Sequence, residues 1–125
     1  MVICVDFDGT CVSHEFPHVG KDIGAVPVLK ELVANGHSLI LWTMRSDGPK
    51  GNFLEDAINW FKENEIPLWG IQTNPNQSSW TSSPKAYCQL YIDDAALGCP
   101  LVSDTRDYVD WSRVREMLVK KKIII

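Results

Sequence analysis

Two aspartates follow directly on an apolar run near the start of the chain, in the segment VICVDFDGTCV. Carboxylates are among the side chains least often buried in full, and aspartate is depleted in strands. A buried strand over residues 2–7 that ends with Asp6 and Asp8, two positions apart, therefore directs both acids out of the same face of the chain. Paired carboxylates in such a position favour metal binding or proton transfer.

Two later apolar runs, HSLILWT and CQLYI, also end in polar residues. If these runs are parallel strands, all the polar groups lie at the carboxyl edge of one sheet, where such sheets bind their ligands. The residues at these two ends are Thr43, Met44 and Arg45, then Asp93 and Asp94.

The spacing of apolar residues predicts strands that alternate with helices. The expected strands cover residues 2–7, 37–43, 68–72 and 88–92, with a short fifth at 99–102 and a further edge strand compatible with 123–125. The expected helices cover residues 27–35, 52–64 and 111–121. Gly36 is expected to end the first helix and Asn52 to cap the second. The third helix is expected to bury Trp111, Val114, Met117 and Leu118.

Strands joined by helices at this spacing favour parallel βαβ units with right-handed crossovers. The sequence therefore predicts an α/β fold, a Rossmann-like three-layer sandwich with a mainly parallel central sheet. Its 125 residues are enough to bury one hydrophobic core, so a single domain over residues 1–125 is expected.

Four carboxylates at one edge of a sheet cannot all stay ionised in a small space unless a cation compensates them. Their ligand atoms are oxygens, with no neighbouring histidine or thiolate ligand, and this set favours Mg²⁺ over zinc. Proteins usually hold Mg²⁺ through one or two carboxylates and the phosphate of a substrate. The expected ligands of the ion come from Asp6, Asp8, Asp93 and Asp94.

Two further residues suit a phosphorylated substrate. The hydroxyl of Thr43 can bond a phosphoryl oxygen, and Lys85 lies just before the strand expected at 88–92. Because Lys85 is the only basic residue between Lys62 and Arg106, it is the natural candidate to neutralise both a phosphate and a nucleophilic carboxylate.

These segments resemble the motifs of the haloacid dehalogenase-like phosphohydrolases. VDFDGT is similar to their first motif, LILWT to their second, and PKAYCQLYIDD to the third and fourth. The resemblance covers residues 2–94 and implies that Asp6 is a nucleophile that forms an aspartyl-phosphate. It implies that Asp8 protonates the leaving group and then activates water, while Thr43 and Lys85 bind and neutralise the phosphoryl group.

The same resemblance implies a ligand set for Mg²⁺ and a set of substrate contacts. The ion would be held by Asp6, the backbone carbonyl of Asp8 and one of the pair Asp93 and Asp94, with Asp94 favoured. The expected substrate contacts are Gly9, Thr10, Met44 and Arg45.

Two departures from the family pattern are visible. Many relatives carry a further acid three or four residues after the acidic pair, whereas Leu97 and Gly98 stand here. Many also carry an inserted cap domain, whereas the segments 11–22 and 73–84 have room only for a flap and a loop. The expectation is a minimal member with no cap domain and an open site. Solvated loop histidines are expected for His14 and His18, and Trp80 either stacks on a ligand or pins its own loop.

Composition narrows the function classes. The net charge of −4 argues against a non-specific nucleic-acid or membrane surface, and no apolar run is long enough to cross a membrane. The four cysteines have no zinc-type spacing, which favours reduced thiols in a cytoplasmic protein. The predicted function is a Mg²⁺-dependent phosphomonoesterase. Two alternatives stay open: a non-catalytic domain that binds metal or phosphate, and a nucleic-acid end-processing phosphatase that works with a partner.

Overall fold

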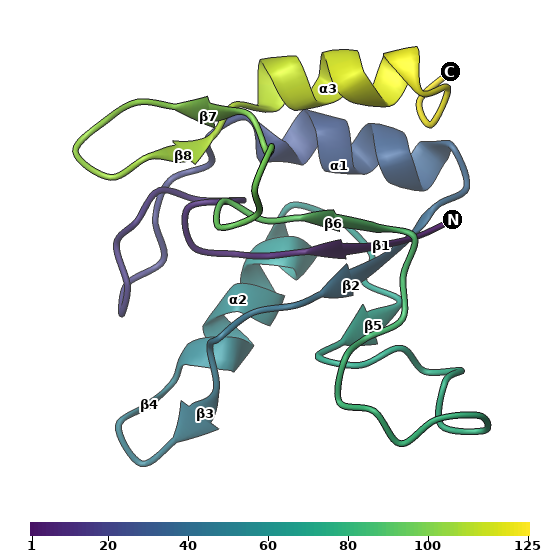
Figure 1. Cartoon of the computed structure of the whole chain (residues 1–125). Helices are drawn as coiled ribbons and strands as arrows, with labels where there is room; N and C mark the ends of the chain where they lie inside the picture. The colour runs from purple at the N-terminus through teal and green to yellow at the C-terminus, as the bar shows by residue number, and fades with distance from the viewer.

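The computed structural model describes all 125 residues and contains a central sheet of four parallel strands (Figure 1). The strands are shorter than predicted, the first two mainly at the carboxyl end, where Asp6 and Thr43 lie in loops, and the last two mainly at the amino end. The predicted parallel α/β arrangement is confirmed. The strands are β1 (Val2–Val5), β2 (Ser38–Leu41), β5 (Gly70–Ile71) and β6 (Leu90–Ile92), in the order β5-β2-β1-β6.

Two short antiparallel hairpins lie outside this sheet. The short strand predicted at 99–102 exists in part, but it belongs to a hairpin and does not extend the central sheet. The edge strand considered for 123–125 is absent, since Ile123 and Ile124 are buried in the hydrophobic core instead. The hairpins join β3 (Asp47–Gly48) to β4 (Gly51–Asn52) and β7 (Leu101–Val102) to β8 (Tyr108–Val109).

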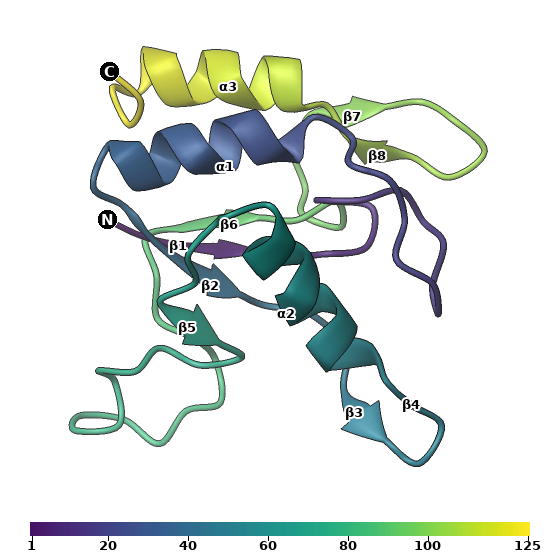
Figure 2. The same ribbon diagram turned by 180° about the vertical axis from the view of Figure 1, so that it is seen from behind.

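One face of the sheet carries all three helices, α1 (Ala25–Ala34), α2 (Phe53–Glu63) and α3 (Trp111–Lys120) (Figure 2). Ile3 and Val5 of β1 point to this face, and both belong to a buried hydrophobic cluster of 22 residues that includes residues of every helix. None of the helices is long and apolar enough to span a membrane. The helices contribute Val28, Leu29 and Leu32 from α1, Ala57, Trp60 and Phe61 from α2, and Trp111, Val114 and Leu118 from α3.

The opposite face of the sheet has no helix. Its central residues, Cys4 and Ile40, form a small cluster with Ala86, which belongs to the long connection between β5 and β6. A right-handed crossover from β5 to β6 passes over this face, and a loop makes the crossing in place of a helix. The predicted three-layer sandwich is therefore not found. Residues 73–84 explain the difference, because their Asn, Ser and Pro residues oppose helix formation.

The helix ends follow local backbone chemistry. α1 ends at Gly36 as predicted, where φ is 86°, a left-handed conformation that suits glycine. Asn52 makes no side-chain cap on α2. Instead Asp47 in β3 accepts the Glu55 N–H at 3.0 Å, so the hairpin before the helix supplies its cap. On α3, Met117 was expected to face inward but is 43% exposed.

Glu65 occupies, after α2, the left-handed position that Gly36 occupies after α1, with a φ of 58°. A side chain in this conformation costs about 1 kcal/mol relative to glycine. Glu65→Gly is therefore expected to raise the free energy of unfolding by up to about 1 kcal/mol, measured by urea denaturation. Glu63→Gly, at a helical position of α2, is the matched control and is expected to lower it. A Glu65→Gly protein less stable than the wild type would contradict this account.

Candidate functional site

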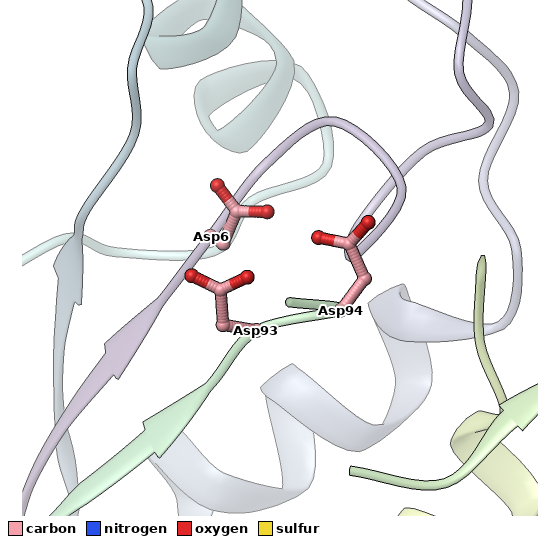
Figure 3. A group of neighbouring side chains, drawn as sticks. All are labelled: Asp6, Asp93 and Asp94. Carbon is pink, nitrogen blue, oxygen red and sulfur yellow. The ribbon is translucent and has the colours of Figure 1, made fainter. Parts of the chain in front are cut away.

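Three carboxylates meet where β1 and β6 end (Figure 3). Asp6 follows β1, Asp93 and Asp94 follow β6, and one oxygen from each lies within 4.8 Å of the other two. Val5 and Ile92 are register partners in these parallel strands, so the residues that follow them emerge side by side. The predicted convergence of Asp6 with the acidic pair is present, and this group of three is hereafter the acidic cluster.

Thr10 connects two members of the acidic cluster. Its side chain is fully buried, and its hydroxyl donates to Asp6 Oδ2 at 2.8 Å. The same hydroxyl accepts the Asp94 N–H at 3.0 Å and lies 3.3 Å from Asp94 Oδ1. The sequence predicts substrate contact for Thr10, but a fully buried hydroxyl has no access to a substrate. Its role in the structure is to fix the positions of Asp6 and Asp94.

Burial and crowding disfavour the ionised form of Asp6. Desolvation is the largest cause, the charge of Asp93 adds to it, and the pKa of Asp6 rises from an ordinary 3.8 to about 8. Burial also raises the pKa of Asp93. No lysine or arginine forms an ion pair with any member of the acidic cluster. The one basic side chain beside the cluster is the imidazole of His14, next to Asp94. An added cation would therefore be needed to offset all three carboxylates in their ionised form.

Asp6 and Asp93 also line a cavity of about 390 Å³ together with Thr43, hereafter the carboxylate cavity. Gln72 holds Thr43 in place, since Gln72 Oε1 accepts the Thr43 N–H at 2.9 Å and Gln72 Nε2 donates to the Thr43 carbonyl. Met44 lies at the rim and is 97% exposed. The structure thus brings Thr43 to Asp6 as predicted. Gln72 was not among the predicted site residues. As a polar residue at the carboxyl end of the predicted strand 68–72, it could have been included by the same rule that selected Thr43.

Asp8 is not part of the acidic cluster, because its carboxylate pairs with Arg45. Arg45 Nε donates to Asp8 Oδ2 at 2.8 Å and Arg45 Nη2 donates to Asp8 Oδ1 at 2.7 Å. Both oxygens of Asp8 are therefore occupied by a bidentate pair. Asp8 was expected to share the metal site with Asp6. In the structure Asp6 lies with Asp93 and Asp94, whereas Asp8 pairs with Arg45.

Arg45 is a buried structural residue in this conformation, only 3% exposed. Its guanidinium lies 5.0 Å from the centroid of Phe7 and 5.1 Å from that of Phe16. Arg45 Nη2 also donates to the His18 carbonyl at 2.9 Å. The substrate contact predicted for Arg45 is thus replaced by contacts that tie the flap 11–22 to Asp8.

His14, expected to be a solvated loop residue, reaches the acidic cluster. Its Nε2 lies 3.3 Å from Asp94 Oδ2 and 3.0 Å from the Asp107 carbonyl in the β7–β8 hairpin. Gly9 permits this approach, because it has a φ of 77° and a Cβ there would lie 2.1 Å from His14 Nε2. Gly9 therefore makes room for the imidazole of His14. No spacing rule in the sequence predicts the contact between His14 and Asp94, because it depends on how the flap 11–22 folds onto the end of β6.

Lys85 does not pair with the carboxylates in this structure. Its side chain is exposed, and its ammonium lies 5.7 Å from the ring centroid of Tyr91. Tyr91 and Asp93 lie on the same face of β6 because they are two positions apart. Lys85 thus lies on the same face of the sheet as Asp93, as its predicted role in neutralising a phosphoryl group requires, but its ammonium is directed at the ring of Tyr91.

The fold and the site define a small α/β protein with a four-stranded parallel sheet and an acidic cluster at its carboxyl edge. No family model and no curated protein matches the chain. A solved structure described as the conserved protein coded by a locus from Bacteroides thetaiotaomicron is 34% identical and superposes with a TM-score of 0.79. The match covers 97% of this chain and 91% of that chain, so the chain belongs to the same family as that conserved protein.

Arg45→Met is expected to lower the free energy of unfolding by about 3 kcal/mol, because it leaves the partly buried Asp8 carboxylate without its cation. Arg115→Met is the matched control. It breaks the exposed pair with Glu31 and is expected to cost less than about 1 kcal/mol. Urea denaturation of both proteins measures the difference. Equal losses in the two variants would show that the Asp8 pair is not structural.

The raised pKa of Asp6 predicts how the metal-free protein responds to pH. The folded chain keeps the Asp6 proton to about pH 8, whereas the unfolded chain loses it near pH 4. Asp6 therefore makes its whole contribution to the free energy of unfolding below about pH 4, and this contribution is lost as the pH rises to about 8. In a chelator, the melting temperature is expected to fall over this window.

Asp6→Asn removes the charge with little change of shape, so the fall with pH is expected to be smaller in this variant. The control is Asp56→Asn, on the exposed side of α2, which is expected to leave the pH dependence as in the wild type. Parallel melting curves for the wild type and Asp6→Asn at every pH would refute the assignment of the raised pKa to Asp6.

Proposed function

We propose that this protein is a Mg²⁺-dependent phosphohydrolase that cleaves phosphate monoesters through an aspartyl-phosphate on Asp6. The observation that carries the proposal is the acidic cluster itself, three carboxylates within 4.8 Å at the carboxyl edge of a parallel sheet, with no lysine or arginine paired to them. A site of this kind stays ionised only with an added cation. The resemblance of the surrounding segments to phosphohydrolase motifs supplies the reaction.

The chemistry of the donor set fits a hard divalent cation. Every ligand offered by the acidic cluster is a carboxylate oxygen, as Mg²⁺ prefers. Asp6, Asp94 and the backbone carbonyl of Asp8 would hold the ion, with Asp93 as the alternative to Asp94. When bound, Mg²⁺ supplies positive charge that offsets the carboxylates and the phosphate.

The proposed reaction proceeds in two steps on this chain's own residues. In the first, an oxygen of Asp6 attacks phosphorus, the bond between phosphorus and the ester oxygen breaks, and the leaving oxygen takes a proton from Asp8. In the second, Asp8 takes a proton from water, the water oxygen attacks phosphorus, and the bond to Asp6 breaks. Thr10 restrains Asp6 for the attack by bonding its Oδ2.

Thr43 and Lys85 are proposed to bind the phosphoryl group. Thr43 lines the carboxylate cavity with Asp6, so its hydroxyl is available to a phosphoryl oxygen in that space. Lys85 would have to turn from the ring of Tyr91 toward Asp93. Its exposed, flexible side chain makes such a movement inexpensive.

One contact favours the non-catalytic alternative, a domain that only binds metal or phosphate. Both oxygens of Asp8 accept hydrogen bonds from Arg45, so in this conformation the carboxylate is directed at the guanidinium, and Asp8 does not line the carboxylate cavity. Catalysis by Asp8 therefore requires the pair to open when substrate binds. A protein that binds Mg²⁺ but hydrolyses no phosphate ester would support the alternative.

Asp6→Asn is expected to reduce turnover of a phosphate monoester by at least about a thousandfold, because the amide is a poor nucleophile. The measurement is release of inorganic phosphate in Mg²⁺. Asp56→Asn is the matched control and is expected to keep the wild-type rate, since Asp56 is exposed on α2. An Asp6→Asn protein that turns over near the wild-type rate would exclude the nucleophile assignment.

The metal dependence is tested on the wild-type protein. A chelator is expected to abolish turnover, Mg²⁺ to restore it and to raise the melting temperature, and Ca²⁺ to inhibit, since its looser coordination misplaces the attack. If chelation changes neither turnover nor melting temperature, the acidic cluster is not a metal site.

A further inference from the structure

A second hollow lies beside the carboxylate cavity, on the sheet face that has no helix. It has a volume of about 350 Å³ and is lined by the rings of Trp80, Tyr87 and Tyr91, by Lys85, and by the polar residues Thr81 and Ser83. Rings, one ammonium group and hydroxyls together offer contacts to both a flat apolar surface and an anion.

The loop that carries these residues is rigidly built. Gln77 is 6% exposed, its Nε2 donates to the carbonyls of Ser83 and Lys85, and its Oε1 accepts the Tyr87 N–H at 2.7 Å. Asn74 is 5% exposed and donates to the Tyr87 carbonyl at 2.8 Å. Two buried amides therefore fix the backbone on both sides of Trp80, so that a ligand meets a preformed surface.

The rings held by this loop are exposed to solvent. Trp80 is 62% exposed and Tyr87 is 52% exposed, although the two rings contact each other edge to face with centroids 5.3 Å apart. Each ring covers at most one face of the other, so flat aromatic surface stays open. Rigid aromatic side chains that stay exposed are typical of surfaces that stack on planar rings.

The hollow and the acidic cluster share one face of the sheet. Tyr91 lines the hollow and Asp93 lines the carboxylate cavity, and the two residues lie two positions apart on the β6 segment, about 7 Å along the strand. The ammonium of Lys85, over the ring of Tyr91, lies on the same face. A ligand can therefore contact the rings at one end and direct an anionic group past Lys85 toward the carboxylate cavity.

We propose that the Trp80–Tyr87 surface binds the planar ring of a phosphorylated ligand of the nucleotide class, with Lys85 attracting its phosphate. Binding of the ring does not depend on the proposed function. Only hydrolysis of the bound phosphate rests on it. Lys85 is the single basic residue that lines the hollow. One cation suits a ligand with one phosphate group better than a long polyanion, whose binding depends on many basic contacts.

The test measures binding in a chelator, where no turnover interferes. The probes are adenosine monophosphate, ribose 5-phosphate, which lacks the ring, and adenosine, which lacks the phosphate. Trp80→Ala is expected to weaken binding of adenosine monophosphate and adenosine about tenfold, a typical loss for one stacked base, and to leave ribose 5-phosphate unchanged. Trp69→Ala is the matched control, because Trp69 is 37% exposed but lies outside this loop, and Trp80→Phe is expected to restore much of the affinity.

Each outcome separates the ring site from the proposed function. If Trp80→Ala leaves the preference for adenosine monophosphate over ribose 5-phosphate unchanged, the ring site is refuted, even where both compounds are hydrolysed in Mg²⁺. If nucleotides bind in a Trp80-dependent manner and no ester is hydrolysed, the ring site stands and the phosphohydrolase proposal fails. If Trp80→Ala changes only the molecular mass in solution, the surface is an interface between copies of the chain and the proposal is overturned.

Discussion

The repulsion among the carboxylates of the acidic cluster is the constraint on which the rest of this site depends. Parallel pairing of β1 with β6 forces Asp6 and Asp93 to emerge side by side. Thr10 then fixes the positions of two of these carboxylates, because its buried hydroxyl donates to Asp6 and accepts the N–H of Asp94. A fold that only needed stability would avoid this arrangement, since each buried charge without a partner costs several kcal/mol. Its presence at a ligand-binding edge favours a functional origin.

The two faces of the sheet differ in a way that matters for that site. Three helices bury one face in a continuous core, whereas the other face has only the loop between β5 and β6. The loop leaves Tyr91 and Trp42 half-buried where a helix would cover them. The carboxylate cavity and the hollow lined by Trp80, Tyr87 and Tyr91 are separate, with no lining residue in common. The absence of a third layer is therefore what leaves the side chains on this face of the sheet partly open to solvent.

The sequence predicted the features that depend on local patterns. Buried parallel strands are apolar runs, so their carboxyl ends, and with them Asp6, Thr43 and Asp93, were placed at one edge from the sequence alone. The loop composition of residues 73–84 already argued against a helix there, and applying the crossover rule to it would have predicted two layers in place of three.

Most of the contacts that sequence reasoning missed join residues distant in the chain. Arg45 and Asp8 are 37 positions apart, and His14 meets a carbonyl 93 positions away, so no periodicity marks either contact. The cap of α2 comes from Asp47, not Asn52, because the β3–β4 hairpin folds back over the helix start. Such contacts depend on how loops pack after the sheet has formed, and residue type alone gives no sign of the partner.

Asp6 and Asp8 lie two positions apart, and the structure gives them opposite surroundings. Asp6 faces two other carboxylates and has no cation, while Asp8 has a bidentate arginine. Neighbouring carboxylates with different environments are how enzymes assign one acid to attack and another to proton transfer. Here the arginine also joins the flap, through the His18 carbonyl and the ring of Phe16, to the second aspartate. The pair of Arg45 with Asp8 is thus one of the contacts that hold the flap, so the position of the flap and the surroundings of Asp8 depend on the same guanidinium.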